Sequence, residues 1–121
     1  MLRQIGFLLF AVLISCHTVK KQAPSPITPQ LTETEKQNAI ELIGANDCII
    51  CHTIDRKVIG PAFTDVSKKY DATSTNINKL VKKIINGGDG SWGDIPMTPH
   101  KNLQQEDARK IVTYILSLKN Q

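Results

Sequence analysis

The sequence is most constrained by a short motif, Cys48-Ile49-Ile50-Cys51-His52, in which two cysteines separated by two residues are followed directly by a histidine. A C-x-x-C-H motif is the signature of c-type haem attachment. Two thiols at this spacing can reach the two vinyl groups on one side of a porphyrin, and the adjacent histidine then falls under the iron as its proximal ligand. The motif therefore predicts one covalently bound haem.

Three other interpretations of the motif fit less well. A thioredoxin-like redox pair requires a preceding strand and a βαβ context, which the sequence does not show. A zinc site requires a fourth cysteine or histidine ligand, and only His100 remains in the folded part. A structural disulfide between Cys48 and Cys51 would leave His52 unexplained. Haem attachment accounts for all three residues.

The composition agrees with a small domain that needs a filler for its core. Hydrophobic residues make up 40% of the chain and charged residues 21%, as in ordinary soluble domains, but aromatic residues make up only 5%. Small domains bury a low fraction of their surface, so a haem would add apolar core that the side chains lack.

The formal net charge is +4. No run of basic residues interleaved with aromatics is present, so we expect no nucleic-acid partner.

A second ligand for the iron is predicted at Met97. Apart from Met1 it is the only methionine, and it lies between two prolines in Ile95-Pro96-Met97-Thr98-Pro99. A lone methionine is usually core filler, but this one lies in a polar, glycine-rich stretch, where filler is a poor explanation. His100 is the rival ligand. A histidine–methionine pair gives a higher potential than two histidines, and we favour Met97.

The remaining pattern predicts an all-α fold of three to four helices. Thr32 and Glu35 form a capping box that begins a helix, which is expected to run to about Ile43 and to stop at Gly44. A shorter helix over residues 63–70 is opened by Pro61. Two amphipathic helices are indicated by apolar residues at helical spacing: Ile77, Leu80, Val81, Ile84 and Ile85, ended by Gly87-Gly88, and then Ala108, Ile111, Val112, Ile115 and Leu116. Residues 45–62 and 86–103 are expected to be irregular loops that carry the site.

The N-terminal part is interpreted as an export signal and a tether. Residues 1–15 contain Arg3 and an apolar run over residues 5–14, which is too short to span a bilayer. The sequence Leu13-Ile14-Ser15-Cys16 resembles the bacterial lipobox, which implies removal of residues 1–15 and acylation of Cys16 by more than one chain. The alternative is an unmodified cysteine. Residues 16–30, with three prolines, form the tether, and residues 31–121 form the domain.

From about Glu35 to Lys119 the chain closely resembles the small bacterial class I cytochromes c, of the type that donate electrons to terminal reductases and oxidases. The matching segments are the Cys-Ile-Ile-Cys-His-Thr-Ile-Asp run at 48–55, Ile-Gly-Pro-Ala-Phe at 59–63, Asp-Val at 65–66, Asn-Gly at 86–87, Trp-Gly at 92–93, Ile-Pro-Met at 95–97 and Leu-Ser-Leu-Lys at 116–119. The resemblance implies the class I cytochrome c fold around one haem c.

The resemblance also implies a role for each matching residue. Cys48 and Cys51 correspond to the thioether cysteines, and His52 and Met97 to the axial ligands. Pro61 corresponds to the proline whose carbonyl accepts the imidazole N–H of the proximal histidine. Trp92 corresponds to the tryptophan that donates its indole N–H to a haem propionate. The chain departs from the family pattern at three places: Thr98 replaces a frequent proline, Tyr114 a frequent tryptophan, and Gln104 is a weak N-cap.

An iron closed on both faces has no position for a substrate, so the sequence predicts an electron carrier and not an enzyme. The expected role is transfer of single electrons between respiratory-type redox proteins, through brief contacts that surface lysines steer. The carrier is expected to be a monomer on the periplasmic side of the envelope, anchored to a membrane by lipid. The alternative function is a haem-based gas or peroxide sensor in which Met97 is displaced.

Overall fold

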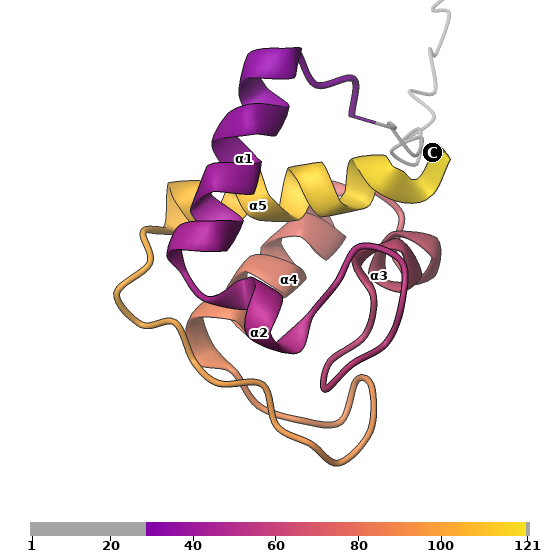
Figure 1. The fold of residues 1–121 in the computed structure, drawn as a ribbon, viewed down its shortest axis with the longest axis vertical. Helices are drawn as coiled ribbons and strands as arrows, with labels where there is room; N and C mark the ends of the chain where they lie inside the picture. Colours follow the sequence, from indigo (N-terminus) through magenta and orange to yellow (C-terminus); the bar gives the residue numbers. More distant parts are fainter. Residues whose placement is uncertain (1–28, 121) are drawn as a thin grey trace, which may run out of the picture.

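The computed structural model describes residues 29–120 of the 121-residue chain. The predicted signal and lipidation site, and all but the end of the predicted tether, lie outside the described residues. The elements in chain order are α1 (Glu33–Ala45), α2 (Cys48–Cys51), α3 (Phe63–Lys69), α4 (Ser74–Asn86), α5 (Gln105–Ser117) and a final 3₁₀ turn, η1 (Leu118–Asn120) (Figure 1). Residues 29–120 form two isolated β-bridges and no strand, and the all-α prediction is confirmed.

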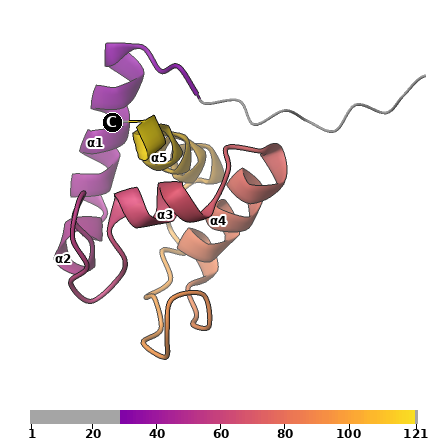
Figure 2. The same ribbon diagram turned by 90° about the vertical axis from the view of Figure 1, so that its right-hand side faces the viewer.

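Helix α5 organises the core. It packs against α1, α3 and α4, and Figure 2 shows it lying between α1 and α4. Its predicted apolar stripe is deeply buried, with Ile111 and Val112 each 1% exposed. Burying each side chain of this size contributes about 1.5–3 kcal/mol. Tyr114, which stands at the predicted tryptophan position, is also buried.

Helix α1 begins as predicted and ends later than predicted. The Thr32 backbone N–H donates to Glu35 Oε2 at 2.8 Å, and the Glu35 N–H donates to Thr32 Oγ1 at 3.3 Å, which completes the capping box. The predicted end at Gly44 was wrong, because the helix continues to Ala45. The reason is a side-chain donor beyond it: Asn46 Nδ2 donates to the Leu42 carbonyl at 2.8 Å, so a carbonyl of the last turn is satisfied without a left-handed glycine.

Helices α4 and α5 match the predicted stripes. Thr73 caps α4, because its Oγ1 accepts from the Asn76 N–H at 3.2 Å. The helix ends at Gly87, whose φ of 66° lies in the region that favours glycine. Gln104 provides no side-chain cap for α5, as expected, and two acidic residues, Glu106 and Asp107, face the helix dipole in the first turn.

The predicted irregular loop over residues 45–62 contains a helical turn. Residues 48–51 form α2, so the expectation of irregular structure throughout this stretch was wrong. Asp47 precedes the turn in the left-handed conformation, with φ 57° and ψ 17°, and His52 ends it in an extended conformation. A single turn has too few residues to show a periodic apolar pattern, which is why the sequence did not indicate it.

Candidate functional site

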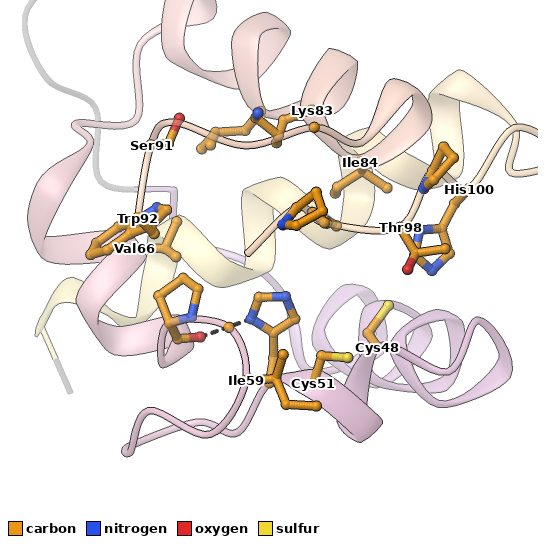
Figure 3. A pocket seen from close by; sticks show the side chains of 18 of the residues that line it. Cys48, Cys51, Ile59, Val66, Lys83, Ile84, Ser91, Trp92, Thr98 and His100 are labelled. Carbon is orange, nitrogen blue, oxygen red and sulfur yellow. Dashed lines mark hydrogen bonds between the residues drawn. The ribbon is translucent and has the colours of Figure 1, made fainter. Parts of the chain in front are cut away.

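A pocket of about 820 Å³ opens between α2, the loop that follows it, and residues 87–103. Its volume lies within the range of small-molecule and cofactor sites. The lining includes all six predicted site residues, Cys48, Cys51, His52, Pro61, Trp92 and Met97. The inner wall is apolar and comes from α3, α4 and α5: Val66, Ile84, Ile111, Val112 and Ile115. Figure 3 shows Ser91 and Trp92 at one end of this pocket and Cys48 and His100 at the other.

Helix α2 places the two cysteines on one edge of the pocket. Residues three positions apart in a helical turn face the same side, and Figure 3 shows Cys48 and Cys51 next to each other. Both thiols are free in the structure. Burial raises the pKa of the Cys48 thiol, and the negative charge of Asp47 raises it further, although a backbone hydrogen bond opposes the shift.

The His52 ring is fixed by contacts on several sides. Its Nδ1 lies 2.8 Å from the Pro61 carbonyl oxygen. A carbonyl only accepts, so Nδ1 carries a proton and donates, which leaves Nε2 as the ring nitrogen outside this contact. The Phe63 ring stacks on the imidazole, with centroids 5.4 Å apart and planes 16° from parallel. Gly60 lies so close that a Cβ there would be 2.7 Å from Nδ1.

Met97 is held by its backbone. It forms a β-bridge with Gly88, in which each residue's N–H donates to the other's carbonyl at 3.0 Å. The Met97 side chain is half-buried and packs against the core cluster. Gly87 supports this arrangement, because a Cβ on it would come within 2.8 Å of Pro99 N and closer still to the Met97 carbonyl. The absence of proline at Thr98 leaves these contacts in place.

His100 bridges two distant parts of the chain. Its Nε2 lies 3.0 Å from the Asn46 carbonyl oxygen and therefore donates to it, while its backbone N–H donates to the Ile84 carbonyl at 3.0 Å. Its Nδ1 is buried without a hydrogen-bond partner among the described residues. The sequence showed His100 only as a rival ligand. Its contact with Asn46 joins residues 54 positions apart, and no local pattern indicates such a pair.

Trp92 is not part of the core. It is 37% exposed, and the Lys69 ammonium lies 4.2 Å from the centroid of its ring. Lys69 also donates to the Ser91 carbonyl at 2.6 Å. Lys83 of α4 donates to the Asp89 carbonyl at 3.1 Å. Both lysines therefore make contacts with residues 89–92 that the sequence did not reveal.

The pocket fits the group that the motif predicts. A haem c requires two neighbouring thiols and an apolar interior, and the described residues provide both, with Cys48 and Cys51 beside a pocket lined by aliphatic side chains. His52 Nε2 remains available because Nδ1 is bound to Pro61. Met97 also lines the pocket, and the inner walls consist of buried aliphatic side chains.

Comparison with known proteins decides the family. Residues 37–119, more than half of the chain, match the family model described as cytochrome c. The chain belongs to the cytochrome c family. This membership implies one haem c bound covalently through Cys48 and Cys51, and electron transfer as its chemistry. None of the helices between residues 29 and 120 is long and apolar enough to cross a membrane.

Named relatives agree with this membership. The chain is 39% identical to the cytochrome c-551 of Pseudomonas denitrificans over 79 residues, which cover 65% of this chain and 95% of that protein. It is 40% identical to the cytochrome c-552 of Nitrosomonas europaea over 79 residues, 65% of this chain and 77% of that protein. The crystal structure of wild-type Nitrosomonas europaea cytochrome c552 aligns with a TM-score of 0.62 at 40% identity, over 66% of this chain and 99% of that one. The predicted class I cytochrome c fold is confirmed.

Proposed function

We propose that this cytochrome is a lipid-tethered, extracytoplasmic carrier of single electrons, with His52 and Met97 as the two axial ligands of its haem. One observation carries the proposal. The cysteine pair, His52 and Met97 come from two segments far apart in the sequence, and all four line the same apolar pocket. A haem c supplies one-electron cycling between Fe(II) and Fe(III) when it is bound in such a pocket.

The assignment of His52 as proximal ligand is supported by its tautomer and its fixed orientation. The hydrogen bond from Nδ1 to the Pro61 carbonyl directs Nε2 to the metal and increases the basicity of the ring. Pro61 is buried, so this hydrogen bond is shielded from water. The stacked Phe63 ring restrains the imidazole plane. Rotation of the ring would break both contacts at once.

Met97 is preferred to His100 as the second ligand because His100 has another use. His100 Nε2 donates to the Asn46 carbonyl, so ligation through this nitrogen would require that hydrogen bond to break. The Met97 backbone is fixed by two hydrogen bonds to Gly88, while its thioether has no strong hydrogen-bonding group to give up. A thioether ligand also raises the reduction potential relative to a second imidazole.

The closed pair of ligands is the reason for proposing a carrier that is not an enzyme. With an imidazole on one face and a thioether on the other, no position is left for a substrate. The aliphatic side chains of Val66, Ile84 and Ile111 exclude water from the interior. A dry site with unchanged ligands reorganises little when an electron arrives or leaves, which suits rapid transfer.

Trp92 is proposed to donate its indole N–H to a haem propionate. The side chain lines the pocket yet is 37% exposed, a position suited to a carboxylate that lies at the border between protein and solvent. An indole N–H at such a border needs an acceptor when the pocket is filled. A propionate provides one.

The partners are proposed to be redox proteins that dock briefly on the side of the cysteine motif. Ile49 and Ile50, between the two cysteines, are 64% and 65% exposed, and Ile95 is 68% exposed. Apolar side chains at the site of electron exit favour a small, short-lived interface. The cytochrome itself is proposed to act as a monomer without nucleic-acid contacts.

The membrane tether rests on the sequence around Cys16, outside the described residues. Export agrees with the chemistry, because haem attachment to cysteine pairs in bacteria takes place outside the cytoplasm. A Cys16→Ser variant of the full chain should move from the membrane fraction to the soluble periplasmic fraction with its haem spectrum unchanged. Retention of this variant in the membrane fraction would refute the lipid anchor.

The carrier function is tested by absorption spectra of the full-length holoprotein. The oxidised protein should show the weak far-red band of a methionine–ferric iron bond, and the reduced protein should not bind carbon monoxide rapidly. Met97→Ala should abolish the band, lower the potential and admit carbon monoxide. The control is His100→Ala, which should keep the band. Rapid and complete binding of carbon monoxide by the unmodified protein would instead favour a gas or peroxide sensor.

A further inference from the structure

Lys69, the last residue of α3, contacts two consecutive residues of the segment that leads to Met97. Its Nζ donates to the Ser91 carbonyl at 2.6 Å and lies 4.2 Å from the centroid of the Trp92 ring. The hydrogen bond joins residues 22 positions apart. A buried lysine would use such contacts to satisfy its charge, but Lys69 is exposed. Water can solvate the Lys69 ammonium without these contacts. Their main effect is therefore to restrain the loop.

The loop over residues 87–97 has few other connections near its tip. Gly88 and Met97 pair at its base, and Lys83 holds Asp89. Between residues 90 and 96, within the described part of the chain, the hydrogen bonds and cation–π contacts to other elements all come from Lys69. Four glycines of this loop have positive φ, so its backbone has little intrinsic stiffness.

Helix α3 is also the element that supports His52. It begins with Phe63, whose ring stacks on the imidazole, and it ends with Lys69. The helix therefore touches the proximal side of the pocket at one end and the Met97 segment at the other. Because this seven-residue helix is rigid, it keeps these two contacts at a fixed distance from each other.

We propose that Lys69 is a positioning residue that keeps the Met97 segment closed over the haem by holding Ser91 and Trp92 against α3. The proposal rests on the proposed function, in which Met97 is an axial ligand. Lys69 touches neither the iron nor its ligands in this scheme. It limits the opening of residues 90–96 and so limits the loss of Met97 from the metal.

Lys69→Met is the informative variant, because methionine keeps an apolar stem of similar length and lacks the ammonium. Loss of a charge-assisted hydrogen bond together with an exposed cation–π contact should increase the open population of the loop about tenfold. The matched control is Lys68→Met. Lys68 is the adjacent exposed lysine on the same helix, and its ammonium makes no hydrogen bond or ion pair with the other described residues. Lys69→Arg keeps both the cation and a donor.

Two measurements on the oxidised, full-length holoprotein test the proposal. The rate at which added imidazole replaces the far-red methionine band should rise about tenfold in Lys69→Met, remain unchanged in Lys68→Met, and stay within about threefold of the unmodified protein in Lys69→Arg. Hydrogen exchange of backbone amides between residues 90 and 96 should show the same order, and it does not depend on which residue ligates the iron.

The two proposals fail in different ways. An unmodified protein without the far-red band would refute Met97 as a ligand, and exchange of residues 90–96 would still decide the role of Lys69. A normal band together with equal imidazole rates and equal exchange in Lys69→Met and Lys68→Met would refute the role of Lys69 alone. Acceleration by both substitutions would also refute it, because a general charge effect would then explain the change.

Discussion

Gly60→Ala tests whether the position of the His52 ring is set by close packing of the backbone against it. A Cβ built on Gly60 lies 2.7 Å from Nδ1 and 2.9 Å from Nε2 of the imidazole, and nearer still to the carbon between them. Ordinary contacts of such an atom begin at 3.4 Å, so the ring or the backbone must move by about 1 Å to relieve the nearest contact. Because Phe63 stacks on the ring, the free space for that movement is small.

The expected cost has two parts. Overpacking of a well-filled site costs about 1–3 kcal/mol. A displaced ring also lengthens the hydrogen bond from Nδ1 to the Pro61 carbonyl, which is worth about 1 kcal/mol. The free energy of unfolding of the holoprotein should therefore fall by about 2–4 kcal/mol. A weaker hydrogen bond makes the imidazole less basic, so the reduction potential should rise.

The assay is denaturant unfolding followed by circular dichroism and haem absorbance, together with a potentiometric titration. Gly44→Ala is the control, because its Cβ meets nothing within 4 Å and it lies inside α1. That substitution should stabilise the protein by about 0.5–1 kcal/mol and leave the potential unchanged. The reasoning is wrong if Gly60→Ala has the stability and potential of the unmodified protein, or if both variants behave alike.

Two further substitutions probe the Met97 loop and the first helix. Gly87 has a φ of 66°, and a Cβ on it would lie 2.8 Å from Pro99 N, whereas Gly90 has a positive φ but open space around its Cβ. Gly87→Ala should therefore lower the thermal midpoint of the far-red band more than Gly90→Ala. Equal midpoints would contradict the packing argument. The Glu35 carboxylate accepts a hydrogen bond from the Thr32 N–H, which lowers its pKa, so its contribution to stability is present at neutral pH and is lost as the pH falls through the folded pKa. In denaturant unfolding, Glu35→Gln should therefore reduce the loss of stability at acidic pH. An unchanged loss of stability at acidic pH would show that the Glu35 cap does not cause it.

Local patterns in the sequence were sufficient to predict most of the helices and to select the residues that line the pocket. Helical spacing around Ile84 and Ile111 located α4 and α5, because apolar residues that recur every three to four positions form one face of a helix whatever the rest of the chain does. The cysteine motif indicated haem because its thiols and its histidine are neighbours in sequence. These features depend on residues a few positions apart, and a short window contains them completely.

The sequence by itself determined the helical class and the attachment of a haem, and it predicted the residues that are proposed to bind it. Only the tertiary structure revealed that Gly60 packs against the His52 ring, that His100 donates to Asn46 and that Lys69 holds Ser91. Each of these contacts joins side chains and backbone atoms that no periodicity relates, since their meeting depends on how α3, α4 and the loops pack around α5. The spacing of neighbouring residues determines which face of a helix is apolar. The hydrogen-bond partner of a given polar atom depends instead on the tertiary packing of the whole domain.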